Sequence, residues 1–445
     1  MNNLICISGT SGVGKTTVAN LLACVLENNS SIIVGGDDCH KWERNNEMWK
    51  KFTHLNPEAN NIELEFENLL KLKNNQSILR KKYNHHSGFF DDPIIIEPKK
   101  NIIYEGLHSL YSENIRDICD LKIYIDTDEE LKIAWKINRD INKRGYSEKQ
   151  VIETIQRRLS DEQKFINHQK DYADVIVRFV FHGISVGLEY EIKNPKYENL
   201  FEQVKHFYNL KKEFIDTCSL LSENEQLVQN KGGNVSFKYK DKIMITSSGV
   251  NLKNISMFEG LCVRSLNGNY FSFQDGRPSL EIDSHLYLKD AVIHAHPKHI
   301  LTFLCCENSK EKLEEIFPSH KFHYIKYVAP GKKLAEEIKQ CKENIIFCQN
   351  HGVFITGSSL KESFFLLKEL EKIAESKIEK PTNSNIPTRI GSLFPDNVIL
   401  PEKNQETNKI LYDNIVNNLL IPRFLTEEEE NELLNMEEEK YRRQQ

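Results

Sequence analysis

The feature that most constrains this chain is a glycine-rich segment near its start, GTSGVGKTT at residues 9–17. It fits G-x-x-x-x-G-K-[ST], a pattern that binds phosphate groups. The apolar run at residues 4–7 predicts a buried strand before it, and residues 18–23 predict a helix after it. Glycines let the backbone curl so that its N–H groups point inward, and the helix start adds positive charge there. We therefore expect a nucleotide-binding loop made by Gly9, Gly12, Gly14, Lys15, Thr16 and Thr17, rather than a turn that only joins strand to helix.

Specific roles follow for this loop and for two acids that end later strands. Lys15 is expected to reach the β- and γ-phosphates, and the Thr16 hydroxyl to ligate magnesium. Asp37 ends an apolar run, at the edge where open α/β sheets bind ligands, and is a candidate base for a substrate hydroxyl. Its alternative role is to cap a helix starting near Lys41. Glu105 ends another apolar run, where an acid that helps to hold magnesium belongs.

Four arginines follow a strand predicted at residues 121–126. Arg139 and Arg144 lie on or just after a predicted helix at residues 130–143, and Arg157 and Arg158 lie on the next one. A row of cations is usually a solvated helix face. Here the row follows a late strand of a phosphate-binding domain, where a lid closes over phosphates, so we expect Arg139 and Arg144 to contact the nucleotide.

Together these residues resemble the phosphoribulokinase and uridine kinase family over roughly residues 1–180. The resemblance rests on the glycine-rich loop and on GDDCH at 36–40, PEAN at 57–60, YEGLH at 104–108 and YADVI at 172–176. It implies ATP and Mg²⁺ as cofactors, with Asp37 as catalytic base, Glu105 assisting magnesium, and acceptor contacts from His40, Arg157 and Arg158. GDDCH and YEGLH are closer to phosphoribulokinase, whereas IDTDEEL at 125–131 is closer to uridine kinase. The acceptor stays open between a pentose phosphate, a nucleoside and another sugar.

Composition limits the class of protein. A chain of 445 residues is expected to hold two or three domains. Its net charge of −6 is spread over residues of both signs, so we expect no nucleic-acid and no membrane partner. Ten scattered cysteines without C-x-x-C spacing, no signal segment and no apolar run long enough to cross a bilayer predict a cytoplasmic protein.

The second half contains two further glycine-rich turns. KGGNVSFK at 231–238 predicts a turn into a strand, and KIMITSSG at 242–249 predicts a strand that ends in hydroxyl groups and glycine. Backbone N–H and hydroxyl groups at both turns could wrap a phosphate. Taken alone, they are also ordinary hairpin features.

Three histidines form a candidate metal site. His294 and His296 lie in DAVIHAHP, and alternate residues of a strand share a face, so their imidazoles would project together. His351 follows a second apolar strand, and three imidazoles with one open position describe a catalytic zinc site. Glu281 is a carboxylate that could act as acid or base beside it. Because the chain has 15 histidines, a chance pair is the alternative.

The order GGNVS, TSSG, PSLE, His-x-His and NHG resembles the class II aldolase/adducin family, which includes fuculose-phosphate aldolase, over roughly residues 211–375. The resemblance implies Zn²⁺ held by His294, His296 and His351, with Glu281 transferring the proton. It also implies a substrate phosphate held by Gly233, Asn234, Ser248, Gly249 and Ser279. Leu280 stands where many sugar-phosphate aldolases have a second serine, which removes one hydroxyl from that site. The family's tetramers imply a homo-oligomer formed through this domain.

We therefore expect an α/β chain with three parts. Residues 1–195 form a P-loop domain with a doubly wound parallel sheet, residues 196–380 an aldolase-like domain with a mainly antiparallel sheet, and residues 381–445 an extension packing on it. Within the extension, residues 393–400 predict a strand and residues 426–430 the start of a helix. The leading hypothesis is a bifunctional enzyme, a sugar or nucleoside kinase joined to a zinc-dependent aldolase acting on a sugar phosphate. The alternatives replace the aldolase by an epimerase, a dehydratase or a non-catalytic adducin-like scaffold.

Overall fold

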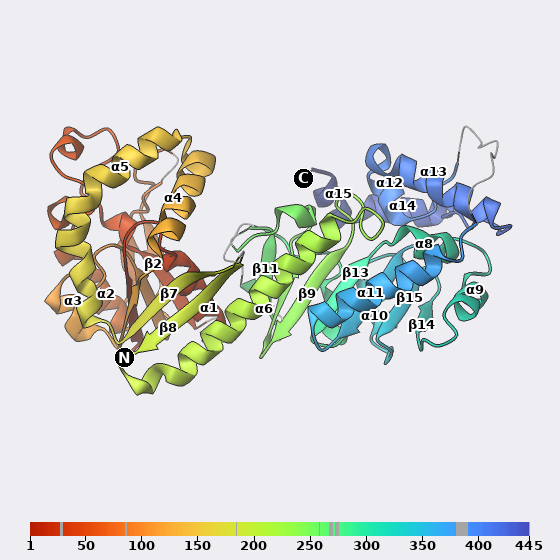
Figure 1. Cartoon of the computed structure of the whole chain (residues 1–445), viewed down its shortest axis with the longest axis horizontal. Coiled ribbons are helices and arrows are strands. Elements are labelled where there is room, and N and C mark those ends of the chain that lie inside the picture. The colour runs from red at the N-terminus through yellow and green to blue at the C-terminus, as the bar shows by residue number, and fades with distance from the viewer. Residues whose placement is uncertain are drawn as a thin grey trace. The chain divides into compact units, whose positions relative to one another are not determined.

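The computed structural model describes residues 1–26, 30–84, 87–183, 185–257, 259–266, 270–271, 276–379 and 390–444 (Figure 1). The chain divides into two compact units, Met1–Tyr208 and Asn209–Gln445. The division falls inside α6 (Glu198–Ser222), whereas we expected the first domain to end at residue 195. No helix in the described ranges combines the length and the apolar character needed to span a membrane.

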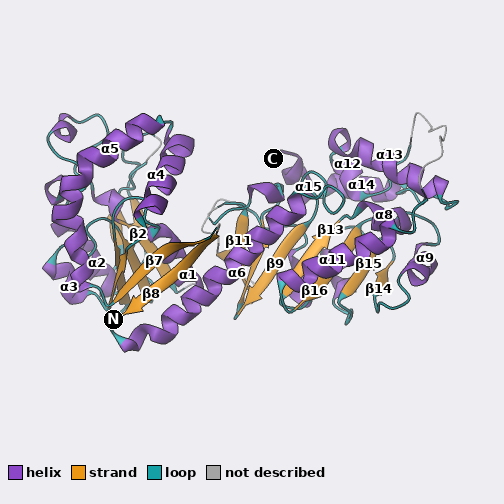
Figure 2. Ribbon diagram, in the orientation of Figure 1, coloured by secondary structure: helices purple, strands orange, loops and turns teal. Residues whose placement is uncertain are grey.

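The first unit is built on a six-stranded sheet, drawn in orange in Figure 2. The strands lie in the order β2-β5-β1-β6-β7-β8. Its strands are β1 (Asn3–Ser8), β2 (Ser31–Gly35), β5 (Asn101–Glu105), β6 (Leu121–Ile125), β7 (Val175–His182) and β8 (Ser185–Ile192). All neighbours run parallel except the β7–β8 hairpin. The predicted doubly wound parallel sheet is confirmed.

Helices and a separate hairpin surround this sheet. They are α1 (Lys15–Val25), α2 (Ile62–Lys73), α3 (Glu113–Ile118), α4 (Glu129–Arg144), α5 (Glu148–Asp161), β3 (Ile78–Arg80) and β4 (Ile94–Ile96). Leu4 and Cys6 alternate along β1 and pack with Leu69 and Leu72 of α2 in one buried cluster. The parallel register places Ile7, Gly35 and Glu105 side by side, so the loops after β1, β2 and β5 meet at one edge of the sheet.

The second unit is built on an eight-stranded sheet in the order β12-β11-β10-β9-β13-β16-β15-β14. Its strands are β9 (Asn234–Tyr239), β10 (Lys242–Thr246), β11 (Leu261–Ser265), β12 (Tyr270–Phe271), β13 (Ala291–Ala295), β14 (His323–Ile325), β15 (Ile345–Cys348) and β16 (Gly352–Gly357). Only the β14–β15 pair is parallel among these strands. The prediction of a mainly antiparallel sheet is confirmed.

The helices of the second unit are α7 (Ile282–Tyr287), α8 (Lys298–Leu304), α9 (Ser309–Ile316), α10 (Lys332–Ile338), α11 (Leu360–Glu375), α12 (Pro395–Ile399), α13 (Pro401–Asn417), α14 (Glu427–Asn435) and α15 (Glu437–Gln444). Leu334 and Ile338 of α10 pack with Val292, Ile346 and Phe354 of the sheet in a buried cluster. Helix α11 contacts β13 and β16, and α8 contacts β16.

The C-terminal segment corrects one prediction and confirms another. The strand predicted at residues 393–400 is wrong, because these residues contain helix α12. Pro395 occupies its first turn, where the fixed φ of proline suits a helix and its missing N–H has no bond to lose. The helix predicted at residues 426–430 is confirmed as α14, which Thr426 and Glu429 start with a capping box. Residues 380–389, where the predicted extension begins, lie outside the described residues.

Candidate functional site

The glycine-rich loop of the first unit curls around its own lysine. Gly9, Gly12 and Gly14 have φ values of 147°, 91° and 98°, in the region that favours glycine. A Cβ on Gly14 would lie 2.6 Å from the ring of Phe179, so only glycine fits. The Lys15 ammonium donates to the carbonyl oxygens of Gly9 and Thr10, at 3.0 and 2.8 Å. The loop therefore presents N–H groups and one cation within a single concave turn.

The acids predicted at the strand ends lie beside this loop. The Thr16 hydroxyl donates to Glu105 Oε1 at 2.9 Å, and Thr17 lies half-buried one residue further along α1. Burial raises the pKa of Glu105. Asp37 lies in a short turn at residues 36–39, and burial lowers the pKa of Lys15 while Glu105 and Asp37 oppose that shift. The structure thus brings a lysine, a hydroxyl and two carboxylates together at the edge of the sheet.

A buried ion pair that the sequence did not indicate holds the turn that carries Asp37. Arg80 donates to Glu65 at 2.6 Å, to the Gly35 carbonyl at 2.7 Å and to Asp38 at 3.3 Å. The Asp38 carboxylate also accepts from the Tyr83 backbone N–H at 2.8 Å. Asp38 therefore anchors the turn.

We expect Arg80→Met to lower the free energy of unfolding of the first unit by about 3–5 kcal/mol, because Glu65 would stay buried without its cation. All three tryptophans, Trp42, Trp49 and Trp135, lie in the first unit, so their fluorescence in urea reports on that unit. Arg178→Met is the matched control, since Arg178 pairs with Asp126 at the surface and its loss should cost less than about 1 kcal/mol. Equal unfolding midpoints for the two variants would contradict the structural role of Arg80.

A group of cations from α4 and α5 lies next to the loop. Arg139 donates to the Ser11 hydroxyl at 3.4 Å and to Asp140 at 2.9 Å, and Arg144 pairs with the same aspartate at 3.4 Å. Burial, Arg158 and Arg139 lower the pKa of Lys136 to about 7, which shows how close these cations lie. Lys136 was not singled out from the sequence.

The residues predicted to contact the acceptor lie in two environments. His40 is buried, with its ring centroid 4.7 Å from that of His54 and 5.3 Å from that of Tyr83. Burial and the Arg158 charge lower the pKa of His54 to about 2, so Arg158 belongs to the same neighbourhood. Arg157 is exposed on α5.

The three predicted metal-ligating histidines of the second unit converge. All are buried, and one ring nitrogen from each lies within 4.8 Å of the others. His294 Nε2 and His296 Nε2 are 2.9 Å apart. Burial lowers the pKa of His294 well below its ordinary value and that of His351 to about 3, so both rings are neutral, the form that binds metals.

The hydrogen bonds of these rings test whether the site fits a cation. His294 Nδ1 lies 3.2 Å from the Val353 carbonyl oxygen, and His296 Nδ1 lies 3.0 Å from Asp396 Oδ2. Both partners only accept, so each Nδ1 donates a proton outward and each Nε2 is left facing the centre of the cluster. The two Nε2 atoms lie 2.9 Å apart, close enough for one cation to bind both. The donor set therefore fits a metal ion.

Glu281 lies against this cluster and is held by a chain of hydrogen bonds. Its Oε2 accepts from the Asn234 amide at 2.7 Å and lies 3.3 Å from His294 Nε2, while its Oε1 lies 3.4 Å from His351 Nε2. The Asn234 carbonyl oxygen accepts from His285 Nε2, and His285 Nδ1 accepts from the Ser236 hydroxyl at 2.7 Å. Burial lowers the pKa of His285 to about 3, which favours its neutral form. Because His285 binds the carbonyl oxygen of the Asn234 side chain, the NH₂ group of that side chain faces Glu281. Sequence reasoning missed His285.

The predicted substrate residues of the second unit line one pocket that opens to solvent. Its lining includes Gly233, Asn234, Ser248, Gly249, Ser279, Leu280, Glu281, His296 and His351. A bridge between Ser247 and Pro278 joins the two loops that carry the serines. Hydroxyl and backbone N–H groups thus lie on one side of the metal-binding cluster, as a phosphate site requires.

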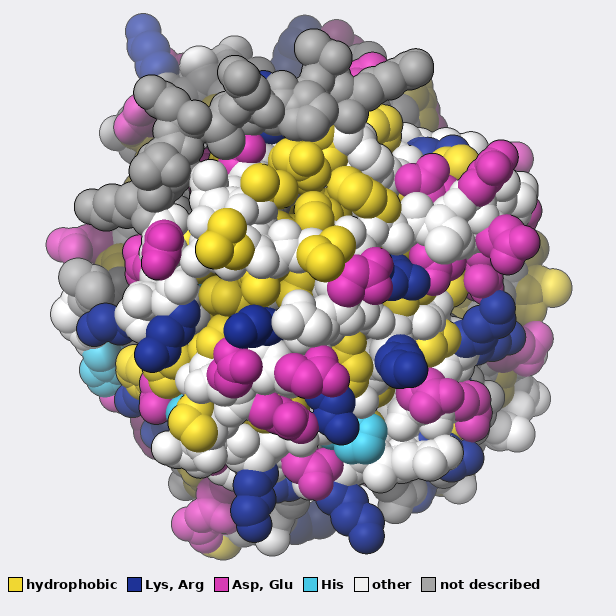
Figure 3. Space-filling model, turned by 90° about the vertical axis from the view of Figure 1, so that its right-hand side faces the viewer, with side chains coloured by type: hydrophobic (Ala, Val, Ile, Leu, Met, Phe, Trp, Pro, Cys, Tyr) yellow, Lys and Arg dark blue, Asp and Glu magenta, His cyan; other side chains and the backbone are white. Residues whose placement is uncertain are grey.

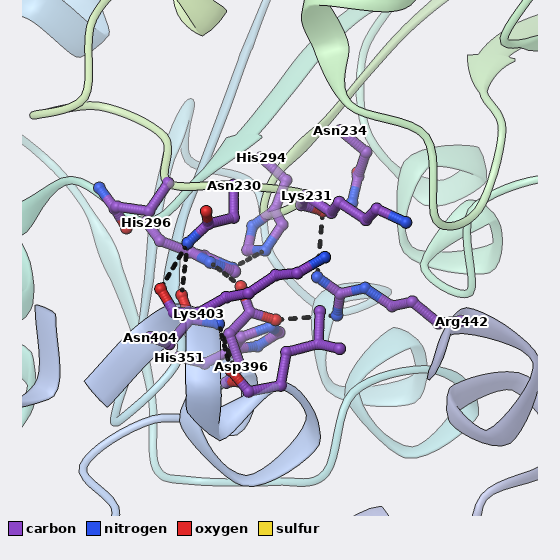
Figure 4. A network of polar contacts seen from close by, with 12 residues as sticks. Asn230, Lys231, Asn234, His294, His296, His351, Asp396, Lys403, Asn404 and Arg442 are labelled. Atoms are coloured by element: carbon purple, nitrogen blue, oxygen red, sulfur yellow. Dashed lines mark hydrogen bonds and ion pairs between the residues drawn. The ribbon is translucent and has the colours of Figure 1, made fainter. Parts of the chain in front are cut away.

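The C-terminal segment supplies side chains that the sequence did not indicate. Asp396 of α12 contacts His296, and Arg442 of α15 contacts Asp396 at 2.8 Å (Figure 4). Burial alone would raise the pKa of Asp396, but Arg442 and His296 hold it below its ordinary value. Glu439 of the same helix also lines the pocket. No local motif marks these residues, because each acts on the site only through the fold.

Comparison with known proteins matches the two halves of the chain to two families. Residues 4–182 match the phosphoribulokinase/uridine kinase family, and residues 212–378 match the class II aldolase and adducin N-terminal domain. A phosphoribulokinase from Synechocystis sp. is 38% identical over 175 residues, which cover 39% of this chain and 53% of the relative. A uridine kinase from Borrelia duttonii is 36% identical over 184 residues, which cover 40% of this chain and 86% of the relative.

The chain spans about half the length of the phosphoribulokinases it matches. Among solved structures, an L-fuculose 1-phosphate aldolase is 24% identical, and the match covers 38% of this chain and 84% of that chain with a TM-score of 0.33.

Proposed function

Since the chain belongs to the phosphoribulokinase/uridine kinase family through residues 4–182 and carries a class II aldolase/adducin domain in residues 212–378, we propose that it is a bifunctional enzyme. The first unit transfers a phosphoryl group from ATP to a hydroxyl of a small sugar. The second unit cleaves a carbon–carbon bond of a sugar phosphate at a zinc site.

In the kinase half, the loop and its neighbours have separate roles. The loop N–H groups and Lys15 hold the β- and γ-phosphates, and Thr16 and Glu105 hold magnesium or its water. Asp37 accepts the proton of the attacking hydroxyl. Arg139, which already contacts loop residue Ser11, and Arg144 neutralise charge on the phosphates.

The side chains around Asp37 favour an acceptor that carries its own phosphate over a nucleoside. Burial, Arg157 and Arg144 act to lower the pKa of Arg158 to about 10, although Asp37 opposes them. Arg158, with Arg157 and Arg144 near it, and Lys136 place positive charge beside Asp37 that a phosphate on the acceptor would neutralise. Comparing a pentulose phosphate with uridine, by ADP release, tests this preference.

In the aldolase half, three imidazoles would hold Zn²⁺. A cation there supplies stabilisation for negative charge that develops on substrate oxygen atoms when the bond breaks. Glu281 returns or removes the proton at the reacting carbon, and Asn234 holds its carboxylate in place. Ser248, Ser279 and the backbone at Gly233 and Gly249 bind the substrate phosphate.

The observation that supports the lyase most is the convergence of three ring nitrogens beside Glu281. The deciding experiment incubates the purified chain with ATP, magnesium, zinc and a panel of pentoses, pentose phosphates and nucleosides. We expect ADP together with products of shorter carbon chain. Products that keep the carbon number would favour an epimerase or dehydratase, and ADP without any zinc-dependent change would favour a scaffold.

We expect Glu281→Gln to keep its zinc but lower the rate of cleavage by about 10²- to 10⁴-fold, the usual contribution of a general acid or base. Bound metal is measured by atomic absorption and cleavage by the aldehyde formed. Glu336→Gln, at an exposed position of α10, serves as the control. Cleavage at the rate of the control would remove Glu281 from the mechanism.

We also propose a cytoplasmic homo-oligomer assembled through the second unit. Hydrophobic side chains gather in one area of the face in Figure 3, among charges of both signs. Leu419 and Ile421, which follow α13, are 94% and 68% exposed. Large apolar side chains that gather on an exposed surface mark protein–protein interfaces. Sedimentation of the full chain gives its mass in solution.

A further inference from the structure

We propose that Asp396 is a positioning residue for the metal site, and that the C-terminal helices exist in part to hold it against His296. This inference rests on the proposed zinc site. It adds a function for residues 391–444, which lie beyond the class II aldolase match at 212–378.

The contact of Asp396 with His296 determines which ring nitrogen faces the ion. Asp396 Oδ2 accepts the Nδ1–H of His296 at 3.0 Å, and both side chains are buried. The Nε2 of His296 is therefore turned toward His294, where the ion would bind. A carboxylate on the far nitrogen of a metal-bound imidazole also raises the basicity of the ligand.

Arg442 holds Asp396 from the other side. Its Nη1 contacts Asp396 Oδ1 at 2.8 Å, and its Nη2 donates to the Lys231 carbonyl at 3.0 Å (Figure 4). Glu439 lies 3.6 Å from the same guanidinium. Both oxygens of Asp396 are thus engaged, one by the ligand and one by the arginine.

The backbone closes over this contact. A Cβ on Gly232 would lie 2.8 Å from Asp396 Oδ2 and 3.0 Å from His296 Nδ1, so the chain passes directly against the pair. A residue with a Cβ at position 232 would press against both side chains, so the close packing of the backbone on this hydrogen bond requires glycine.

Asparagine side chains fix the segment that carries Asp396, and two of them, Asn404 and Asn350, are buried. Asn404 donates to the Asp396 carbonyl at 3.0 Å, and Asn230 donates to Asn404 at 3.2 Å. Asn350, next to the ligand His351, donates to the Leu393 carbonyl at 2.7 Å. These hydrogen bonds join the segment to the loop at Asn230 and to the turn that carries His351.

The test measures zinc affinity by competition with a chromophoric chelator, using the full chain. We expect Asp396→Ala to weaken zinc binding by about 10- to 100-fold, and Asp396→Asn to weaken it less because the amide oxygen can still accept. Asp396→Asn keeps the side-chain shape, so it carries the test if the alanine variant fails to fold. Glu437→Gln, on the exposed side of α15, is the matched control.

A second readout separates positioning from folding. In the cobalt-substituted chain, the visible spectrum of Asp396→Asn should shift relative to wild type, while that of Glu437→Gln should not. Wild-type affinity and spectrum in folded Asp396 variants would overturn the inference and leave the proposed function standing. No divalent-ion binding by the wild-type chain would overturn both.

Discussion

Lys15→Ala should reduce ATP-dependent phosphorylation by about 10³-fold, the cost of removing one preorganised charge from a transition state of high negative charge. Lys15 sits inside the glycine-rich loop, with its ammonium held by the carbonyl oxygens of Gly9 and Thr10. A water molecule in place of the Lys15 ammonium would carry no positive charge. ADP release with the best acceptor of the panel measures the effect.

Two controls define this result. Lys149→Ala, at an exposed position of α5, should phosphorylate at the wild-type rate. Cleavage of a ready-made sugar phosphate by Lys15→Ala should also be unchanged, because the metal cluster lies in the other unit. Phosphorylation by Lys15→Ala at more than a tenth of the wild-type rate would refute the assignment of this loop.

His294→Ala should abolish both zinc binding and carbon–carbon cleavage. His294 is fully buried, and its Nε2 lies 2.9 Å from His296 Nε2 and 3.3 Å from Glu281. Its loss leaves two imidazoles, fewer than the three protein ligands of a catalytic zinc site. Metal content after dialysis and the aldehyde product are the two measurements.

The comparison for this variant is His323→Ala, since His323 lies partly exposed on β14, where its Nδ1 is 3.6 Å from Glu343. It should keep its zinc and its cleavage rate, and both variants should phosphorylate normally. Retention of one zinc per chain by His294→Ala would rule out the three-histidine site and, with it, the aldolase proposal.

Much of the fold could be predicted from short segments. The glycine-rich loop and the apolar runs around it follow from patterns a few residues long, whereas the two sheet types follow from the family resemblances, and the structure confirms both. The wrong prediction of a strand at residues 393–400 has a local cause. A short apolar run does not distinguish strand from buried helix, and Pro395 and Pro401 at helix starts decided for helix.

Other parts of the sites could not be predicted. Arg80 meets Glu65 and the turn at Gly35 across 15 and 45 residues of sequence, and Asp396 meets His296 across 100. Nothing in the spacing of such residues indicates a contact. No local motif distinguishes His285 from the other histidines, whereas in the structure its ring lies between Ser236 and Asn234.

The chemistry available to each half follows from local patterns: a lysine and hydroxyl within a glycine-rich turn, and imidazoles paired at short spacing. A strand or a tight turn places near neighbours in a known geometry. The distant groups that orient this chemistry come together only through the folding of the whole unit. The carboxylate on His296 and the arginine behind it come from helices at the end of the chain, and their meeting depends on how buried surfaces pack rather than on any local pattern.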